Sequence, residues 1–175
     1  MRNLSFASSE PEVSLSVLRI VEDTMVDGPG FRTSIYAAGC PHGCPGCHNP
    51  ESWDIHSGYL IGLEEALRVI LSDEFADVTF TGGDPMYQAR AFSLLAQKVK
   101  EQSDKSIWCY TGYTYEQLLQ HADCMELLRR IDVLVDGRYV QRLRDPDLAF
   151  RGSSNQRIID VPASLRNGQV VLYSM

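Results

Sequence analysis

The chain has 175 residues, of which 44% are hydrophobic and 22% charged, a composition typical of a globular protein rather than a disordered one. Sixteen Lys and Arg against 23 Asp and Glu give a formal net charge of −7, which excludes a global positive field for nucleic acid or anionic lipid. The length suits one domain and is too short for a complete eight-fold (β/α) barrel, which takes about 250 residues.

The first twelve residues differ in composition from the rest. Residues 1–12 are rich in serine and carry Pro11, and we predict a flexible N-terminal arm there. No repeat, low-complexity block or linker follows, so residues 13–175 are predicted to form a single domain. No apolar run has the length of a signal-peptide core at the start or of a bilayer span elsewhere. We therefore expect a cytoplasmic protein that binds neither membrane nor nucleic acid directly.

Predicted strands and helices then alternate along the chain. The apolar patterns predict strands at residues 14–21, 33–38, 78–80, 107–110, 131–135, 158–159 and 170–172. Apolar residues at helical spacing predict helices at residues 63–71 and 92–99 and helical turns within residues 115–128. Alternation of this kind indicates βαβ units and a parallel sheet. Five or six such units fit either an incomplete barrel or an open α/β sheet.

Polar or glycine-rich segments follow four of the predicted strands. These segments are residues 40–47, 82–85, 111–113 and 136–137. In α/β architectures, ligands bind at the carboxyl ends of the strands. We therefore expect the four segments to converge on one site.

The five cysteines divide into a cluster and two isolated residues. Cys40-x-x-x-Cys44-x-x-Cys47 places three thiols within eight residues, whereas Cys109 and Cys124 stand apart and are predicted to be buried structural thiols. A secreted disulfide scaffold would favour an even count, so the clustered cysteines are predicted to bind a metal.

Two metal centres are compatible with this spacing. Thiolates select soft metals, chiefly zinc or iron–sulfur clusters. A [4Fe–4S] cluster held by three thiolates would keep one iron open for chemistry. The alternative is a structural zinc site completed by His42 or His48, although no second cysteine pair lies downstream.

Other motifs accompany the cysteine loop and together with it resemble a known family. They are Asp27-Gly28-Pro29-Gly30-Phe31-Arg32, Thr81-Gly82-Gly83-Asp84-Pro85, Trp-Cys-Tyr-Thr-Gly-Tyr at residues 108–113, Val-Asp-Gly at 135–137 and Arg-Gly-Ser-Ser-Asn-Gln at 151–156. The cysteine loop and the Gly-Gly-Asp-Pro segment resemble the radical S-adenosylmethionine (SAM) superfamily. The remaining segments resemble its glycyl-radical-enzyme activating enzymes, in particular those of anaerobic ribonucleotide reductases. The resemblance covers about residues 17–166.

The resemblance implies a fold, two cofactors and a reaction. The implied fold is α/β, a partial (β/α)6-type barrel of parallel strands. Cys40, Cys44 and Cys47 would each bind one iron of a [4Fe–4S] cluster, and SAM would chelate the fourth iron. Reductive cleavage of SAM would then give methionine and a 5′-deoxyadenosyl radical, with no catalytic side chain beyond the cluster and the SAM site.

The Gly-Gly-Asp segment is implied to bind the amino group of SAM. Without side chains, Gly82 and Gly83 let their backbone carbonyls approach an ammonium closely. Asp84 offers a carboxylate to the same positive region. The alternative role of Asp84 is to cap the helix that follows it.

Further SAM contacts are implied at three strand ends. Gly46, Cys47 and His48 are expected to contact adenine, and Thr111 and Asp136 to contact the methionine or ribose part. The alternatives are a loop hydrogen bond for His48 and a turn role for Asp136.

The partner implied by the resemblance is the large subunit of an anaerobic ribonucleotide reductase, which would lose a hydrogen from a backbone glycine Cα. A low-potential electron donor is also implied. We assign the polar segment 150–156 to partner docking or closure of the SAM site. We expect Arg32 to be exposed to solvent, and the alternative is a contact with a carboxylate or a partner surface. The alternatives are a radical SAM enzyme acting on another glycyl-radical enzyme or a small molecule, and a non-enzymatic zinc-binding interaction module.

Overall fold

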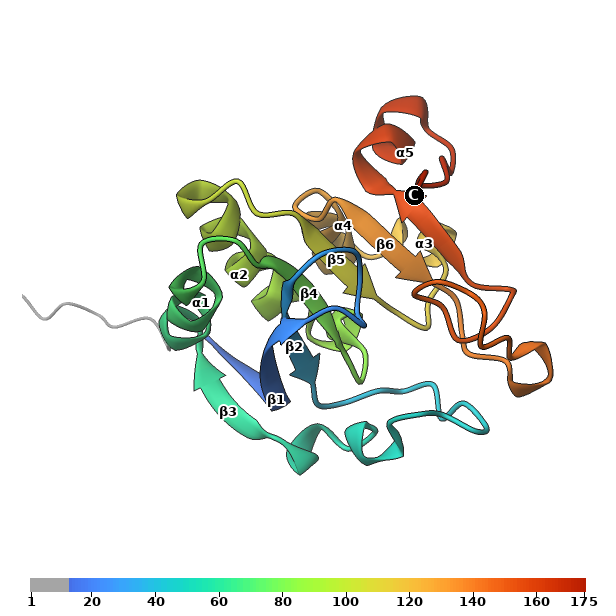
Figure 1. Cartoon of the computed structure of the whole chain (residues 1–175), viewed down its shortest axis with the longest axis horizontal. Coiled ribbons are helices and arrows are strands. Elements are labelled where there is room, and N and C mark those ends of the chain that lie inside the picture. The colour runs from blue at the N-terminus through green and yellow to red at the C-terminus, as the bar shows by residue number, and fades with distance from the viewer. Residues whose placement is uncertain (1–12) are drawn as a thin grey trace, which may run out of the picture.

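The computed structural model describes residues 13–175, and the arm predicted at residues 1–12 lies outside them. One seven-stranded sheet runs through the molecule in the order β3-β1-β2-β4-β5-β6-β7 (Figure 1). The strands are β1 (Ser14–Thr24), β2 (Arg32–Ala37), β3 (Tyr59–Gly62), β4 (Asp77–Gly82), β5 (Ile107–Tyr110), β6 (Val133–Asp136) and β7 (Arg157–Asp160). No helix in residues 13–175 is long and apolar enough to cross a membrane.

The α/β class is confirmed, but the partial barrel of parallel strands is not. The pairs β2–β4, β4–β5 and β5–β6 are parallel, whereas β1–β2, β1–β3 and β6–β7 are antiparallel. Parallel neighbours need a crossover connection, usually a helix. Residues 25–31 between β1 and β2 are too few for one, and residues 137–156 between β6 and β7 contain only the 3₁₀ turn η4 (Gln141–Leu143).

The helices follow from the apolar spacing of the sequence. They are α1 (Leu63–Ser72), α2 (Ala89–Gln102), α3 (Tyr115–Leu118), α4 (Ala122–Leu128) and α5 (Val161–Asn167). Their apolar sides pack on one face of the sheet, where Phe80 of β4 meets Phe92 of α2 with ring centroids 4.9 Å apart. A second apolar cluster, on the other face, joins Trp108 and Val135 to Phe150. The predicted helices and central strands are therefore confirmed.

Three elements at the ends of the sheet differ from expectation. The strand predicted at residues 170–172 makes only an isolated bridge, from Leu172 to Ile159. Strand β3 and helix α5 were not predicted. Strand β3 is a short edge strand with exposed Tyr59 and Leu60, so it leaves no alternating apolar pattern. Helix α5 has a start signal in the sequence: Asp160 accepts a hydrogen bond from Ala163 N (2.8 Å), and a proline occupies the first turn.

Arg32 is buried, so the expectation of a solvated arginine is wrong. Its side chain is 1% exposed and donates from Nε to Thr79 Oγ1 (2.6 Å) and from Nη2 to Val78 O (2.6 Å). The guanidinium also lies 5.5 Å from the Trp108 ring centroid. A Cβ on Gly28 would lie 2.8 Å from Arg32 Cδ, so the Gly-Pro-Gly turn needs its first glycine to fold over this arginine.

Candidate functional site

A cleft of about 580 Å³ lies at the carboxyl ends of the central strands. The four segments predicted to converge all contribute to its lining. From these segments come Cys40, His42, Cys44, Cys47, Gly82, Gly83, Thr111, Gly112 and Gly137. Because β2, β4, β5 and β6 run in the same direction, their ends bring these segments to one edge of the sheet (Figure 1).

The cysteine loop runs from β2 to the 3₁₀ turn η1 (Pro50–Ser52). Cys40, Cys44 and Cys47 are half-buried free thiols. Few backbone hydrogen bonds hold the loop: Cys40 N donates to Trp53 O (3.1 Å), and Cys47 N donates to Cys44 O (3.1 Å). The thiols are therefore accessible from the cleft rather than packed into the core.

Burial changes the acid–base chemistry of one of these thiols. Desolvation raises the pKa of Cys40 to about 11. Because a metal binds the thiolate, ligation at Cys40 would release a proton at neutral pH.

The loop supplies three thiols, the number of protein ligands that a [4Fe–4S] cluster with one open iron takes. Within residues 13–175, no three His, Cys, Asp or Glu side chains, these thiols included, are already gathered around one point. A structural zinc needs four ligands on one ion, whereas in a [4Fe–4S] cluster each cysteine binds its own iron. The two histidines considered as zinc ligands have other neighbours: His42 Nε2 lies 2.6 Å from Asp84 Oδ2, and the His48 ring centroid lies 5.1 Å from that of Tyr139.

The glycine turn after β4 is pressed against the backbone that enters the cysteine loop. A Cβ on Gly82 would lie 2.6 Å from Ala37 N, and one on Gly83 would lie 2.5 Å from Gly39 O. Hydrogen bonds from Gly83 N to Ala37 O (2.8 Å) and from Asp84 N to Gly39 O (2.9 Å) join the two segments. Glycine is thus required here by packing, and a contact with an ammonium group stays a prediction.

Asp84 is fully buried and does not line the cleft. Its Oδ1 accepts a hydrogen bond from Met86 N (2.9 Å) at the start of the 3₁₀ turn η3 (Pro85–Gln88), so the capping role is present. Its Oδ2 accepts from Thr111 Oγ1 and Gly112 N, each at 3.0 Å, and faces His42. The carboxylate is therefore fully hydrogen-bonded within the protein, and its predicted contact with SAM stays a prediction.

Asp136 is also buried, in a network behind the cleft. It accepts a hydrogen bond from Tyr115 N (2.7 Å) and one from Arg157 Nε (3.0 Å). Arg157 extends the network to Glu116, with 2.8 Å between Nη2 and Oε2, and this bond lowers the pKa of Glu116 to about 2. Neither Asp136 nor Gly46 lines the cleft. Their predicted SAM contacts likewise stay predictions.

The cleft also contains residues that sequence reasoning missed. Tyr139 lies against His48, and the guanidinium of Arg19 lies 4.3 Å from the ring centroid of Tyr36. All four residues line the cleft. Tyr139 could have been suspected, because it follows the glycine at the end of β6. Arg19 and Tyr36 carry no such signal, since both lie within strands.

The polar segment at residues 151–156 folds back on itself beside the cleft. Gln156 Oε1 accepts from Gly152 N (2.9 Å), and Gln156 Nε2 donates to Gly137 O (3.0 Å). Asn155 Nδ2 donates to Arg138 O (2.9 Å). These contacts tie the segment to the turn after β6, which explains why it is polar without belonging to the core.

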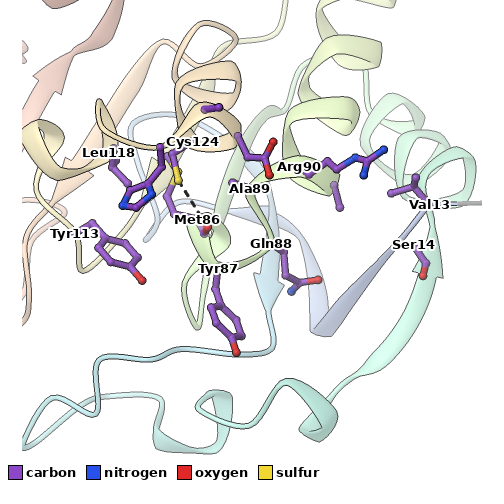
Figure 2. A pocket seen from close by; sticks show the side chains of 14 residues that line it. Val13, Ser14, Met86, Tyr87, Gln88, Ala89, Arg90, Tyr113, Leu118 and Cys124 are labelled. Carbon is purple, nitrogen blue, oxygen red and sulfur yellow. Dashed lines mark hydrogen bonds between the residues drawn. The ribbon is translucent and has the colours of Figure 1, made fainter.

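A second, larger cavity of about 980 Å³ shares no lining residue with the cleft. It lies at the starts of α2 and α4, and Figure 2 shows the Cys124 thiol near the backbone oxygen of Met86, 4.0 Å away. None of the predicted site residues lines it. The cysteine loop and the glycine turn therefore define the candidate site.

Comparisons with known proteins also indicate an iron–sulfur cluster. A family model described as a 4Fe-4S single cluster domain matches residues 26–159. Anaerobic ribonucleoside-triphosphate reductase-activating proteins are similar to this chain over most of their length. The one from Vibrio cholerae is 41% identical over 142 residues, which cover 77% of this chain and 90% of the relative. The one from Escherichia coli K12 is 38% identical over 140 residues (75% and 90%), and the one from Enterobacteria phage T4 is 37% identical over 146 residues (80% and 90%).

Proposed function

The chain belongs to the family of anaerobic ribonucleoside-triphosphate reductase-activating proteins, and on that premise we propose that Cys40, Cys44 and Cys47 hold a [4Fe–4S] cluster whose open iron binds SAM. The protein is an iron–sulfur activating enzyme, and its partner is an anaerobic ribonucleotide reductase. The observation that carries the ligand assignment is the position of three free thiols at the cleft, on the loop after β2. When bound, the cluster and SAM together supply a 5′-deoxyadenosyl radical by one-electron reduction of the sulfonium.

The residues of the chain itself would bind and orient SAM. The backbone of Gly82 and Gly83 borders the cleft beside the cysteine loop, which suits an ammonium group next to an open iron. The aromatic pair of His48 and Tyr139, which also lines the cleft, offers a face for adenine. Thr111 also lines the cleft, where it would contact the methionine or ribose part.

The cleft is open to solvent, which supports a macromolecular substrate. A small-molecule radical enzyme must enclose its substrate to keep water from the radical. Here the reductase would supply the missing wall and present a glycine Cα to the cleft. The parallel strands β2, β4, β5 and β6 would form the wall of a partial barrel around the cluster, and a low-potential donor would supply the electron.

The decisive test of this proposal is reconstitution under anaerobic conditions with iron and sulfide, followed by reduction with dithionite and addition of SAM. We expect about four iron atoms per chain and formation of methionine and 5′-deoxyadenosine. Cys44→Ala should abolish SAM cleavage because it removes one cluster ligand. The matched control is Cys124→Ala, which removes a thiol from the other cavity and should keep both iron and activity.

Two results would contradict the proposal. A colourless protein that holds one zinc ion and no iron would favour the interaction module. A fully loaded protein that fails to cleave SAM, even with the reductase present, would reject the enzymatic function.

A further inference from the structure

His42 is the residue that anchors the cysteine loop to the body of the protein. Its side chain is 9% exposed, although its neighbours Pro41 and Gly43 are exposed. Within residues 13–175, two hydrogen bonds join positions 41–46 to parts of the chain outside the cysteine loop, and His42 makes both of them. The first is from Nε2 to Asp84 Oδ2, and the second is from Arg138 Nη2 to the His42 carbonyl.

The partner of His42 is itself a junction of three segments. The Asp84 side chain is fully buried and belongs to the glycine turn after β4. The same Oδ2 that faces His42 accepts hydrogen bonds from Thr111 Oγ1 and Gly112 N at the end of β5. An ionised carboxylate only accepts hydrogen bonds, so with Asp84 ionised the hydrogen of this contact belongs to His42 Nε2. One carboxylate oxygen thus joins the cysteine loop, the glycine turn and the end of β5.

The imidazole of His42 fits a socket that is shaped for it. A Cβ on Gly112 would lie 2.3 Å from His42 Cδ2, so only glycine leaves room for the ring. The Tyr113 ring packs edge-on against the imidazole, with centroids 4.5 Å apart. The bond to Asp84 is short, at 2.6 Å, as expected for a hydrogen bond to a charged acceptor. The ring therefore has one defined position relative to the glycine turn.

We propose that His42 is a positioning residue, which acts through Asp84 to fix the cysteine loop against the glycine turn. The inference rests on the proposed function, because that function places the open iron on the loop and the SAM amino group at the turn. Two groups on separate segments can react only if the protein holds them at the right distance and orientation. A misplacement of about 1 Å can lower a rate by ~100-fold. In this role the Asp84 carboxylate affects SAM binding through the position of the cysteine loop.

The test compares three variants after anaerobic reconstitution: His42→Leu, His42→Gln and, as a control, His56→Leu. His56 is an exposed histidine of the neighbouring 3₁₀ turn η2 (Ile55–Ser57), whose side chain makes no such bond. The readouts are iron per chain, SAM affinity by titration, and the electron paramagnetic resonance spectrum of the reduced cluster with and without SAM. A purely structural role would change thermal stability without changing the spectroscopic response to SAM.

We expect His42→Leu to retain near-normal iron, because all three cysteines remain and no added atom presses on the backbone beside Cys40. Its SAM affinity should fall by about tenfold or more, and the spectral change on SAM addition should weaken, since the register is lost. His42→Gln should recover most of both properties, because its side-chain amide can donate to Asp84 in place of Nε2. His56→Leu should behave as the unmodified protein.

Wild-type SAM affinity and spectral response in His42→Leu would overturn the inference. Loss of the cluster in both His42→Leu and His42→Gln would also overturn it, because His42 would then serve cluster assembly. If His42→Leu fails to fold, Asp84→Asn takes its place: it retains the shape of the side chain and should show the same loss of SAM response. An unchanged response in that variant contradicts the inference. Failure of the unmodified protein to cleave SAM would instead reject the proposed function.

Discussion

At the scale of single residues, the cleft is shaped by backbone segments that touch where no side chain fits. Gly83 lies against Gly39 O and Gly112 lies against the His42 ring, whereas a Cβ on Gly30 would meet no atom within 4 Å. Glycines that are alike in the sequence therefore have different roles. Those at the cleft keep neighbouring segments in contact, and Gly30 supplies only a positive φ of 72°.

Gly83→Ala should displace the cysteine loop as well as weaken SAM binding. The new methyl group would lie 2.5 Å from Gly39 O, one residue before Cys40. We expect unfolding free energy to fall by roughly 1–3 kcal/mol, measured by urea denaturation of the apoprotein, together with reduced iron per chain after reconstitution. Gly30→Ala is the control, because it adds backbone strain of about 1–2 kcal/mol away from the cleft. Normal iron content in Gly83→Ala would contradict this account.

At the scale of elements, short polar contacts join segments that the hydrophobic core does not reach. Arg32 of β2 bonds to β4 and lies over Trp108 of β5, so one side chain ties three strands to the turn at residues 25–31. Arg157 of β7 bonds Asp136 of β6 and Glu116 of α3. Ion pairs therefore stabilise the β6–β7 edge of the sheet in addition to its backbone hydrogen bonds.

The Glu116–Arg157 pair should make stability depend on acid pH in a defined window. The arginine lowers the folded-state pKa of Glu116 to about 2, against roughly 4.3 in an unfolded chain. Its contribution is therefore present above about pH 4.3 and is lost as the pH falls through about 2. Because the Glu116 side chain is 58% exposed, we expect Glu116→Gln to cost at most ~1 kcal/mol near neutral pH.

The measurement is urea unfolding of the apoprotein at several pH values, with Glu65→Gln as a control. Glu65 is an exposed acidic residue in the first turn of α1. The difference between the unmodified protein and Glu116→Gln should shrink as the pH falls from about 4.3 toward 2. A difference that stays constant across this range would show that the loss comes from packing and not from charge.

The elements with a regular pattern could be predicted from the sequence, and the edges of the sheet could not. Apolar residues at spacings of three and four fix α1 and α2, because each buries one side on the sheet. The direction of β1 and β7 depends on the connection to the neighbouring strand. Because no crossover helix links β1 to β2 or β6 to β7, both pairs are antiparallel. An exposed edge strand such as β3 has too little burial to leave an alternating pattern.

The candidate site was predictable where its residues follow strands. The cysteine loop and the glycine turn lie at strand ends, so the topology alone brings them together. The burial of Asp84 was not predictable, because it requires His42 to turn back from its loop across more than 40 positions of sequence. Arg32 was misjudged for a similar reason: its acceptors belong to β4 and to backbone that no motif marks.

At the scale of the whole molecule, the two faces of the sheet differ in how firmly they are closed. Helices α1, α2 and α4 bury one face in a continuous apolar core. The other face carries a smaller cluster around Trp108, and the cleft lies at the carboxyl ends of the strands. The cysteine loop crosses the carboxyl edge with few backbone hydrogen bonds. Local opening is therefore expected at the loop and not at the helices.

Hydrogen exchange followed by mass spectrometry should show this division. In the apoprotein, peptides within residues 41–49 should exchange much faster than peptides of α2. Loading with iron and sulfide should slow exchange in the loop by about tenfold or more, because ligation at three points restricts its opening. Exchange in α2 should not change, and this makes it an internal control. Equal exchange in the loop before and after loading would contradict the assignment of these cysteines as ligands.

The contact between Gly112 and His42 also has an evolutionary consequence. A side chain at position 112 and an imidazole at position 42 cannot occupy the same space, since the added carbon would lie 2.3 Å from the ring. In homologous chains, substitutions at positions 42 and 112 are therefore expected to be correlated. Lineages that lose the histidine become free to lose the glycine. A set of relatives that keep histidine at 42 and carry larger residues at 112 would show that the loop can be held in another way.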